Sequence, residues 1–281
     1  MCAVKPVLDE LGFTEMPASR TCPRVWWVRS GLLNVLPIHA AGCHNSNPPQ
    51  TALDRVISSY ASTMKSLLYA RERAMTAGRI EIERAVLYAM PSTLPFALSE
   101  AQDLENILTR ASINTETVSN PINEEVRNEL LKYSIVHFAC HGKSMSDPSE
   151  SRLLLQDKPL TVSHLTSLKI EPAKFAYLSA CHTASMRELD LLDESINLSS
   201  AVQLYGYPSV VGTMWHVNDE HSAKVASDVY TWISNEKNRS GFNAQRSAEG
   251  LHKAVRELRN RTRFKDDHDP IAWAPFIHIG I

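Results

Sequence analysis

The amino-acid sequence predicts an α/β protein with a mostly parallel central sheet and helices on both faces. Short apolar runs alternate with amphipathic segments along most of the 281 residues, the pattern of strands linked by helical crossovers. Hydrophobic residues make up 43% of the chain and charged residues 21%, so a packed core is expected rather than disorder. Two apolar runs, at 134–142 and 175–183, end in histidine and cysteine residues, which indicates a reactive site at one edge of the sheet.

The first half of the chain contains three expected strands and three expected helices. Residues 1–23 hold three prolines and little periodicity, so we interpret them as a lead-in or the remnant of a longer N-terminal region, followed by one domain over 24–281. Ser99 is the expected N-cap of the second helix. Asn120 is the expected cap of the third, where Pro121 takes a first position that needs no amide donor. The expected strands are 25–28, 56–60 and 85–90, and the expected helices are 62–77, 99–109 and 121–131.

The second half contains the two runs that end in reactive residues. A hairpin over 152–162 and a short helix over 163–168 separate the histidine-bearing strand from the cysteine-bearing strand. The tail over 273–279 is expected to be a short edge strand at best, because Pro275 cannot donate a ladder hydrogen bond. The remaining expected elements are a helix over 194–205, a strand over 210–215, and helices over 220–233 and 244–258.

Two strand-end side chains, His141 and Cys181, form the candidate reactive pair. Chemistry gathers at the carboxyl ends of parallel strands, and we expect these two strands to be parallel neighbours. An imidazole beside a thiol favours the thiolate, so the two residues could serve as general base and nucleophile in attack on a carbonyl carbon. Gly142 follows the histidine, where the backbone can turn sharply and offer an unobstructed N–H.

The alternation of side chains along a strand gives the neighbouring residues structural roles. His137 is interpreted as an interior histidine, and Cys140, which faces the opposite way from His141, as a buried thiol. His182 is interpreted as a packing or surface group. A zinc site built from these histidines and cysteines is disfavoured, because neighbours on a strand diverge whereas a tetrahedral ligand set converges.

Composition argues against several other classes of function. The net charge of −2 and the pI near 6.6 give no electrostatic reason to expect a nucleic-acid partner. No apolar run approaches the ~20 residues that span a bilayer, and no secretory signal is visible. The five cysteines are irregularly spaced and form no Cys-x-x-Cys motif, which fits free thiols in a reducing compartment. We therefore expect a cytoplasmic protein without a membrane or nucleic-acid partner.

Several motifs, taken in order, resemble the CHAT family. They are His-Phe-Ala-Cys-His-Gly at 137–142, Leu-Ser-Ala-Cys-His-Thr-Ala at 178–184, Leu-Asp-Glu-Ser-Ile-Asn-Leu at 192–198 and Gly-Thr-Met-Trp-His-Val-Asn-Asp-Glu at 212–220. Earlier and later pieces, Leu-Pro-Ile-His-Ala-Ala-Gly at 36–42 and Trp-Ala-Pro-Phe-Ile-His-Ile-Gly at 273–280, also match. Each motif alone is modest, but the ordered set over roughly 24–281 is specific.

The resemblance implies a caspase-like three-layer αβα sandwich that acts as a cysteine endopeptidase on protein or peptide substrates. It implies His141 and Cys181 as the catalytic dyad, with the backbone N–H groups of Gly142 and Cys181 as oxyanion donors. This scheme requires no metal or organic cofactor. CHAT domains are caspase-like and separase-like peptidase domains that often follow tetratricopeptide repeats, so a repeat region or regulator outside this chain and a regulatory, cell-death or defence pathway are expected.

Substrate preference has two candidate residues, Asp219 and Glu194. In separase-like relatives, the acidic residue in the position of Asp219 lines the pocket for a basic P1 residue, and a carboxylate there would pair well with arginine. Both residues also stand at the start of an expected helix, where an acidic side chain is an ordinary cap. Two other functions remain open: a catalytically silent caspase-like interaction or signalling module, and a thiol acyltransferase or hydrolase acting on a small substrate.

Overall fold

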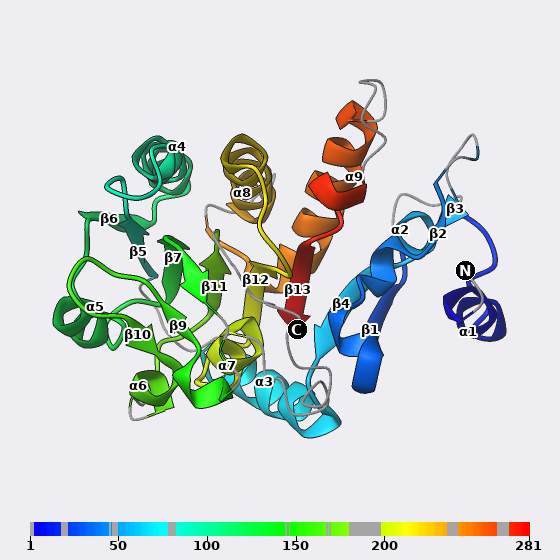
Figure 1. The fold of residues 1–281 in the computed structure, drawn as a ribbon, viewed down its shortest axis with the longest axis horizontal. Coiled ribbons are helices and arrows are strands. Elements are labelled where there is room, and N and C mark those ends of the chain that lie inside the picture. Colours follow the sequence, from blue (N-terminus) through cyan, green and yellow to red (C-terminus); the bar gives the residue numbers. More distant parts are fainter. Residues whose placement is uncertain are drawn as a thin grey trace.

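An eight-stranded sheet forms the centre of the computed structural model, in the order β1-β4-β13-β12-β11-β7-β5-β6 (Figure 1). The structure describes residues 3–17, 22–44, 46, 50–77, 83–143, 145, 147–166, 168, 170–179, 198–234, 241–262 and 270–281. The strands are β1 (Arg24–Val28), β4 (Ile57–Ala61), β5 (Arg84–Ala89), β6 (Asn114–Ser119), β7 (Ile135–Ala139), β11 (Phe175–Leu178), β12 (Ser209–Thr213) and β13 (Phe276–Gly280).

Nearly all pairings in this sheet are parallel. Strands β12, β11, β7, β5 and β6 run in one direction, and β13, β4 and β1 form a second parallel block. The two blocks meet at the antiparallel pair β12–β13, where Val211 lies opposite His278. The mostly parallel α/β architecture expected from the sequence is therefore confirmed.

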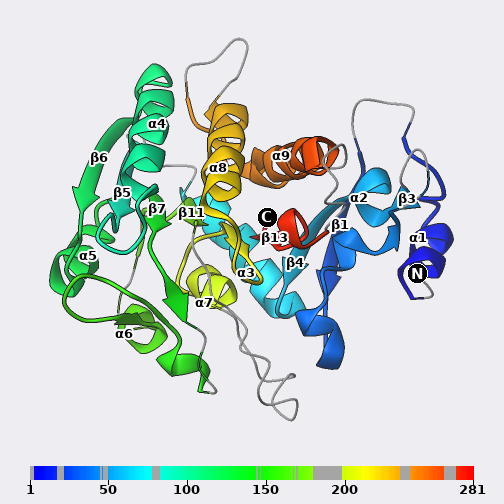
Figure 2. The same cartoon turned by 45° about the horizontal axis from the view of Figure 1, so that its top comes forward.

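Helices cover both faces of the sheet, which makes three layers (Figures 1 and 2). On one face, α4 (Ala97–Arg110), α8 (Asp219–Ser234) and α9 (Ser247–Thr262) pack on strand residues such as Leu87 and Tyr177. On the other face, α5 (Asn123–Glu129), α6 (Val162–Thr166) and α7 (Leu198–Leu204) pack on residues such as Val136 and Leu178, and α3 (Met64–Ala77) contacts α7. Burial of both sheet faces explains why the strands read as continuous apolar runs.

Short elements complete the chain. The expected hairpin exists as β9 (Arg152–Leu153) and β10 (Leu160–Thr161), and β8 (Gly142–Lys143) pairs with β9 to make three strands. Strands β2 (Gly42–Cys43) and β3 (Gln50–Thr51) form a small ribbon before α2 (Ala52–Arg55). Helix α1 (Val4–Glu10) lies within the expected lead-in and packs Leu8 against Val56. The 3-10 helices are η1 (Gly31–Val35), η2 (Ile38–Ala40), η3 (Pro148–Glu150), η5 (Ala244–Arg246) and η6 (Pro270–Ala272).

The tail strand differs from its sequence prediction. The sequence predicts an edge strand, but β13 lies inside the sheet between β12 and β4, and all of its residues are buried. Pro275 precedes the ladder rather than interrupting it, and its carbonyl oxygen accepts the N–H of Met214 at 2.9 Å. A proline just before a strand removes no ladder donor, so the edge assignment was wrong.

Two expected helix caps are also wrong. Helix α4 begins at Ala97, and the Ser99 hydroxyl donates to the Phe96 carbonyl instead of accepting from an N–H. Helix α5 begins at Asn123, so Asn120 is not its cap, and the Asn123 N–H donates to Oδ1 of Asp157 at 2.8 Å. The group that satisfies this N–H lies 34 residues further along the chain, so local sequence spacing does not reveal it.

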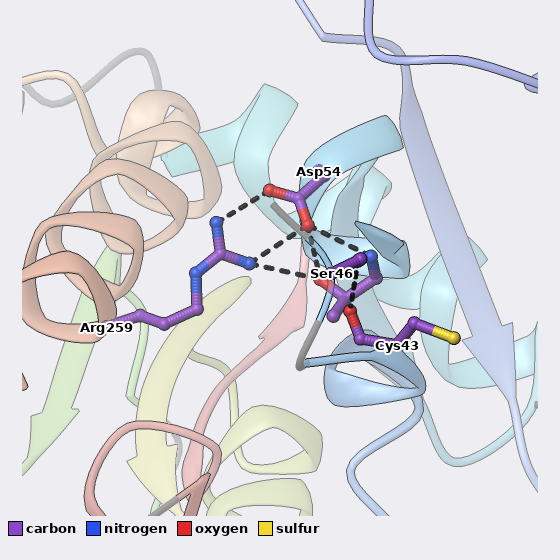
Figure 3. A network of polar contacts seen from close by, with 5 residues as sticks. Cys43, Ser46, Asp54 and Arg259 are labelled. Atoms are coloured by element: carbon purple, nitrogen blue, oxygen red, sulfur yellow. Dashed lines mark hydrogen bonds and ion pairs between the residues drawn. The ribbon is translucent and has the colours of Figure 1, made fainter. Parts of the chain in front are cut away.

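A buried ion pair joins α9 to α2 (Figure 3). The Arg259 guanidinium donates to Oδ1 of Asp54 at 2.6 Å and to Oδ2 at 3.0 Å, and it also donates to the Thr51 hydroxyl at 3.1 Å. Burial alone would raise the pKa of Asp54, but the hydrogen bonds and positive charge of Arg259 outweigh burial, so this pKa is lowered. The pair therefore links α9 to the short helix that immediately precedes β4.

Candidate active site

The strands that carry the two predicted reactive residues are adjacent and parallel. Strand β11 pairs with β7 so that Tyr177 lies beside His137 and Leu178 beside Phe138. The ladder continues one residue beyond β11, because the Ser179 N–H donates to the Phe138 carbonyl at 2.9 Å. Since parallel strands end at the same edge of a sheet, Ser179 and the residues that follow Ala139 lie at the same edge. The predicted parallel arrangement of these strands with β12 is confirmed.

His141 follows β7 by two residues and is half-buried. Its carbonyl accepts the Leu154 N–H at 2.8 Å, and Gly142 pairs with Leu153 in the small three-stranded sheet. In this antiparallel pattern Gly142 and Leu153 do not exchange hydrogen bonds, so the Gly142 N–H points away from β9. His141 therefore lies between two hydrogen-bonded strands, β7 before it and β8 after it.

The other predicted residues of this motif lie as the alternation of side chains requires. Cys140 is fully buried with Val136 and Phe138 in the core on one sheet face, as predicted. His137 is also fully buried, on the opposite face, between α4 and α8.

Cys181 and Glu194 lie outside the residues that the structure describes. The same is true of His182 and Asp193. Ser179 is the last described residue before this stretch, and it stands two positions from Cys181. The structure therefore places the strand that leads to Cys181, and the separation between the His141 ring and the Cys181 sulfur remains a prediction.

The third strand of the edge leads to Asp219. Beyond β12, the Trp215 indole N–H donates to the Ile271 carbonyl at 3.2 Å, and α8 then begins at Asp219. The cap of this helix is Asn218, whose Oδ1 accepts the N–H of Glu220 at 3.0 Å and that of His221 at 3.4 Å. Asp219 is half-buried, and its carboxylate makes no hydrogen bond or ion pair with the described residues. The interpretation of Asp219 as the cap is therefore corrected.

Sequence reasoning missed two polar residues beneath this edge, Glu100 of α4 and Ser222 of α8. Both are buried, and both hydrogen bond with Ser179. A signal did exist for Glu100: it stands three and four residues from Ala97 and Leu104, on the apolar face of its helix. A charged residue on such a face requires a buried partner.

A cavity of about 240 Å³ lies at the opposite edge of the sheet, lined by residues that include Lys174, Ser209 and Phe242. Lys174 and Ser209 adjoin the first residues of β11 and β12, whereas His141 and Ser179 follow the last residues of β7 and β11. Because chemistry in open α/β sheets gathers at the carboxyl ends of strands, the His141 edge is the stronger candidate. Within the described part of the chain, no helix has the length and apolar character needed to cross a membrane.

Several solved structures share this fold. Gingipain R of Porphyromonas gingivalis, an Arg-specific cysteine proteinase, matches with a TM-score of 0.57 at 11% identity, over 81% of this chain and 55% of that chain. The complex of its pro- and mature domains matches with a TM-score of 0.67 at 9% identity, over 99% and 68%. Separase in complex with securin, from Saccharomyces cerevisiae, gives a TM-score of 0.66 at 14% identity, over 94% of this chain and 16% of that chain.

At these identities the structural likeness shows the fold, a caspase-like peptidase fold, and this chain spans 55% of the first gingipain chain and 16% of the separase chain. Among curated protein sequences, none matches at a significant level. The model of the CHAT domain matches residues 2–281, which is almost the whole sequence. This chain belongs to the CHAT domain family.

Proposed function

We propose that this CHAT domain is a cysteine endopeptidase in which Cys181 is the nucleophile and His141 the general base. The observation that carries the proposal is the parallel adjacency of β7 and β11, which brings the strand before His141 beside the strand before Cys181. If these strands were separated or antiparallel, His141 and Cys181 would lie far apart, and the proposal of a dyad would fail. The caspase-like fold of gingipain R and separase adds support, since both share this architecture.

The chemistry follows from the residues at this edge. The Cys181 thiolate attacks the scissile carbonyl carbon, and the charge that develops on oxygen is stabilised by the N–H groups of Gly142 and Cys181. The His141 imidazole takes the thiol proton and gives it to the leaving amine. Departure of the amine leaves the acyl group on the Cys181 sulfur as a thioester. His141 then takes a proton from the water that attacks the thioester carbonyl and gives it to the departing sulfur, which releases the acid product and restores the thiol. The orientation of the Gly142 N–H, directed away from β9, supports its role as a donor to substrate.

Asp219 is our candidate for the residue that selects a basic P1 side chain. Its carboxylate follows the strand next to the cysteine-bearing strand and is not engaged in capping α8. A guanidinium can form two parallel hydrogen bonds with a carboxylate, whereas an ammonium is a point charge, so arginine is preferred over lysine. The Arg specificity named for gingipain R is consistent with a basic P1 pocket in this fold. Glu194 is the second acidic candidate, and both residues remain proposals.

The test is a digest of a proteome-derived peptide library, read by mass spectrometry. The wild-type chain is compared with Cys181→Ala and His141→Ala, after thermal denaturation has shown that each variant folds. We expect cleavage after arginine by the wild type and none by either variant. No cleavage by the wild type would favour a silent interaction module, and turnover of small thioesters or amides alone would favour a thiol acyltransferase or hydrolase.

A further inference from the structure

A cluster of four buried polar residues lies beneath the carboxyl ends of β7 and β11. Its members, here called the Ser179 cluster, are Glu100 of α4, His137 of β7, Ser179, which follows β11, and Ser222 of α8. Their exposed fractions are 6%, 0%, 6% and 4%, respectively. Removing polar and charged groups from water costs free energy unless they form hydrogen bonds or ion pairs. The burial of four such residues together therefore calls for an explanation.

Every polar group of Ser179 is held by a different element. Its N–H donates to Phe138 of β7, its hydroxyl donates to Oε1 of Glu100, and its carbonyl accepts the Ser222 hydroxyl at 2.7 Å. The Ser222 and Ser179 hydroxyl oxygens lie 3.1 Å apart. Strand β7 and the two helices α4 and α8 therefore fix the backbone and the side chain of this one residue.

His137 supports Glu100 from the strand beneath it. Its Nε2 lies 3.1 Å from Oε1 of Glu100, which is an ion-pair distance, although neither ring nitrogen makes an aligned hydrogen bond with the described residues. The imidazole stacks on Tyr177, with ring centroids 5.1 Å apart, and meets the edge of Tyr230 at 5.7 Å. Burial, and then the charge of Glu100, raise the pKa of Tyr230. These rings keep water out, and in a dry environment each hydrogen bond of the cluster is stronger.

The position of the Ser179 cluster, close to Cys181 in the sequence, indicates a role in the candidate site as well as in stability. A second buried cluster joins the hydroxyls of Ser59, Ser209 and Ser247 to His278 at distances of 2.9–3.0 Å from the ring nitrogens. That His278 cluster ties β4, β12 and α9 to β13 and includes no residue next to the candidate dyad. The Ser179 cluster, by contrast, holds the backbone of Ser179, which stands two residues before Cys181.

We propose that Ser179 and Ser222, with Glu100 and His137 behind them, are positioning residues that orient the backbone leading to Cys181. This inference rests on the proposed function and specifies which residues position its nucleophile, Cys181. Rotation of the backbone at Ser179 would displace the sulfur, and a misplacement of about 1 Å at a reacting atom can cost roughly 100-fold in rate. The cluster does not touch substrate, so its loss should affect the reaction step rather than binding.

The experiment compares Ser222→Ala and Ser179→Ala with the conservative variant Ser222→Thr and with Ser247→Ala from the His278 cluster. Two readouts are used: kcat and KM on an arginyl peptide amide, and the rate at which iodoacetamide alkylates Cys181, mapped by mass spectrometry. We expect both alanine variants of the Ser179 cluster to lower kcat about 10- to 100-fold with KM within about twofold, and to slow alkylation by about tenfold. Ser222→Thr should keep most of the activity, and Ser247→Ala should lower the melting temperature without changing kcat.

The two readouts separate the two claims. If the wild type cleaves peptides while Ser222→Ala keeps its kcat and its alkylation rate, the positioning role is wrong and the peptidase function stands. If the wild type cleaves nothing, the peptidase function is wrong, and the alkylation rates alone decide the positioning role. Equal losses of kcat in Ser222→Ala and Ser247→Ala, in proportion to their melting temperatures, would show a purely structural cluster and overturn the inference.

Discussion

Asn218 caps helix α8 and leaves the neighbouring Asp219 free of that task. Oδ1 of Asn218 accepts the Glu220 N–H at 3.0 Å and the His221 N–H at 3.4 Å, so two donors at the helix start already have a partner. Asp219 stands one residue further on, at the first helical position, next to the edge of the sheet that carries His141. The two residues therefore allow the pocket role and the capping role to be tested separately.

Asp219→Asn should lower kcat/KM for arginyl peptides about tenfold or more, which is ~1.4 kcal/mol of transition-state stabilisation. The loss arises because a neutral amide cannot form the charge-assisted pair with a guanidinium. The matched variant Asn218→Ala should lower the free energy of unfolding by about 1 kcal/mol and leave the preference for arginine intact. Peptide kinetics and urea denaturation measure the two effects. Full activity of Asp219→Asn on arginyl peptides would place the P1 pocket elsewhere.

Cysteine reactivity should follow burial and the proposed dyad. Cys43 is exposed, Cys22 is half-buried with a pKa raised by burial, and Cys140 is fully buried. With iodoacetamide at neutral pH we expect Cys181 to react first, Cys43 next and Cys22 slowly, because the thiolate is the reactive form. Cys140 should react only after denaturant is added. Peptide mapping after timed quenching gives the order, and labelling of Cys140 as fast as Cys43 would contradict the assignment of its face.

The Asp54–Arg259 pair should matter much more to stability than an exposed pair on the same helix. Asp54→Asn leaves a buried guanidinium without its counter-charge, so we expect a loss of about 3–5 kcal/mol in the free energy of unfolding. The Arg261–Glu257 pair has side chains 52% and 55% exposed, and Glu257→Gln should cost no more than about 0.5 kcal/mol. Urea denaturation compares the two. Similar small losses in both variants would show that the Arg259 charge is solvated.

Buried histidines should make the protein less stable in acid. Burial, and then the positive charge of Arg256, lower the pKa of His252 from 6.5 to about 4. The unfolded chain therefore binds this proton first as the pH falls, so the stability contributed by the neutral imidazole is complete above about pH 6.5 and is lost toward pH 4. We expect His252→Gln to reduce the slope of the free energy of unfolding against pH by up to about 1.4 kcal/mol per unit in this window. Above pH 7 the two curves should run parallel, and identical slopes below pH 6.5 would exclude the effect.

The architecture was predictable because burial on both faces leaves a clear sign in the sequence. Runs such as 85–90 and 175–178 are apolar at every position, and only a sheet with two covered faces requires that pattern. The parallel order of β7, β11 and β12 followed from the helices between them. The place of β13 did not follow, because the sequence shows that Pro275 lacks a donor but does not show that the ladder starts one residue later.

The candidate site was predictable where it depends on strand ends and unpredictable where it depends on tertiary contacts. His141 and Asp219 follow strands, and strand ends can be read locally. The bonds that Ser179 makes with Glu100 and Ser222 join residues 79 and 43 positions apart, so no local pattern reveals them. The capping alternative for Asp219 lies one residue beyond the observed cap, Asn218, because asparagine and aspartate cap helices about equally well.

Covalent capture of the nucleophile decides whether this chain carries a His141–Cys181 dyad. The probe is a peptide ending in an arginyl acyloxymethyl ketone, and the modified residue is located by mass spectrometry in the wild type and in His141→Ala. Cys43 serves as an internal control, because it is an exposed thiol that no substrate pocket should direct. We predict one probe per chain, attached to Cys181, with Cys43 unmodified and the rate reduced at least about 100-fold in His141→Ala. Attachment to Cys43 at a similar rate, or capture by Cys181 that does not depend on His141, would contradict the dyad.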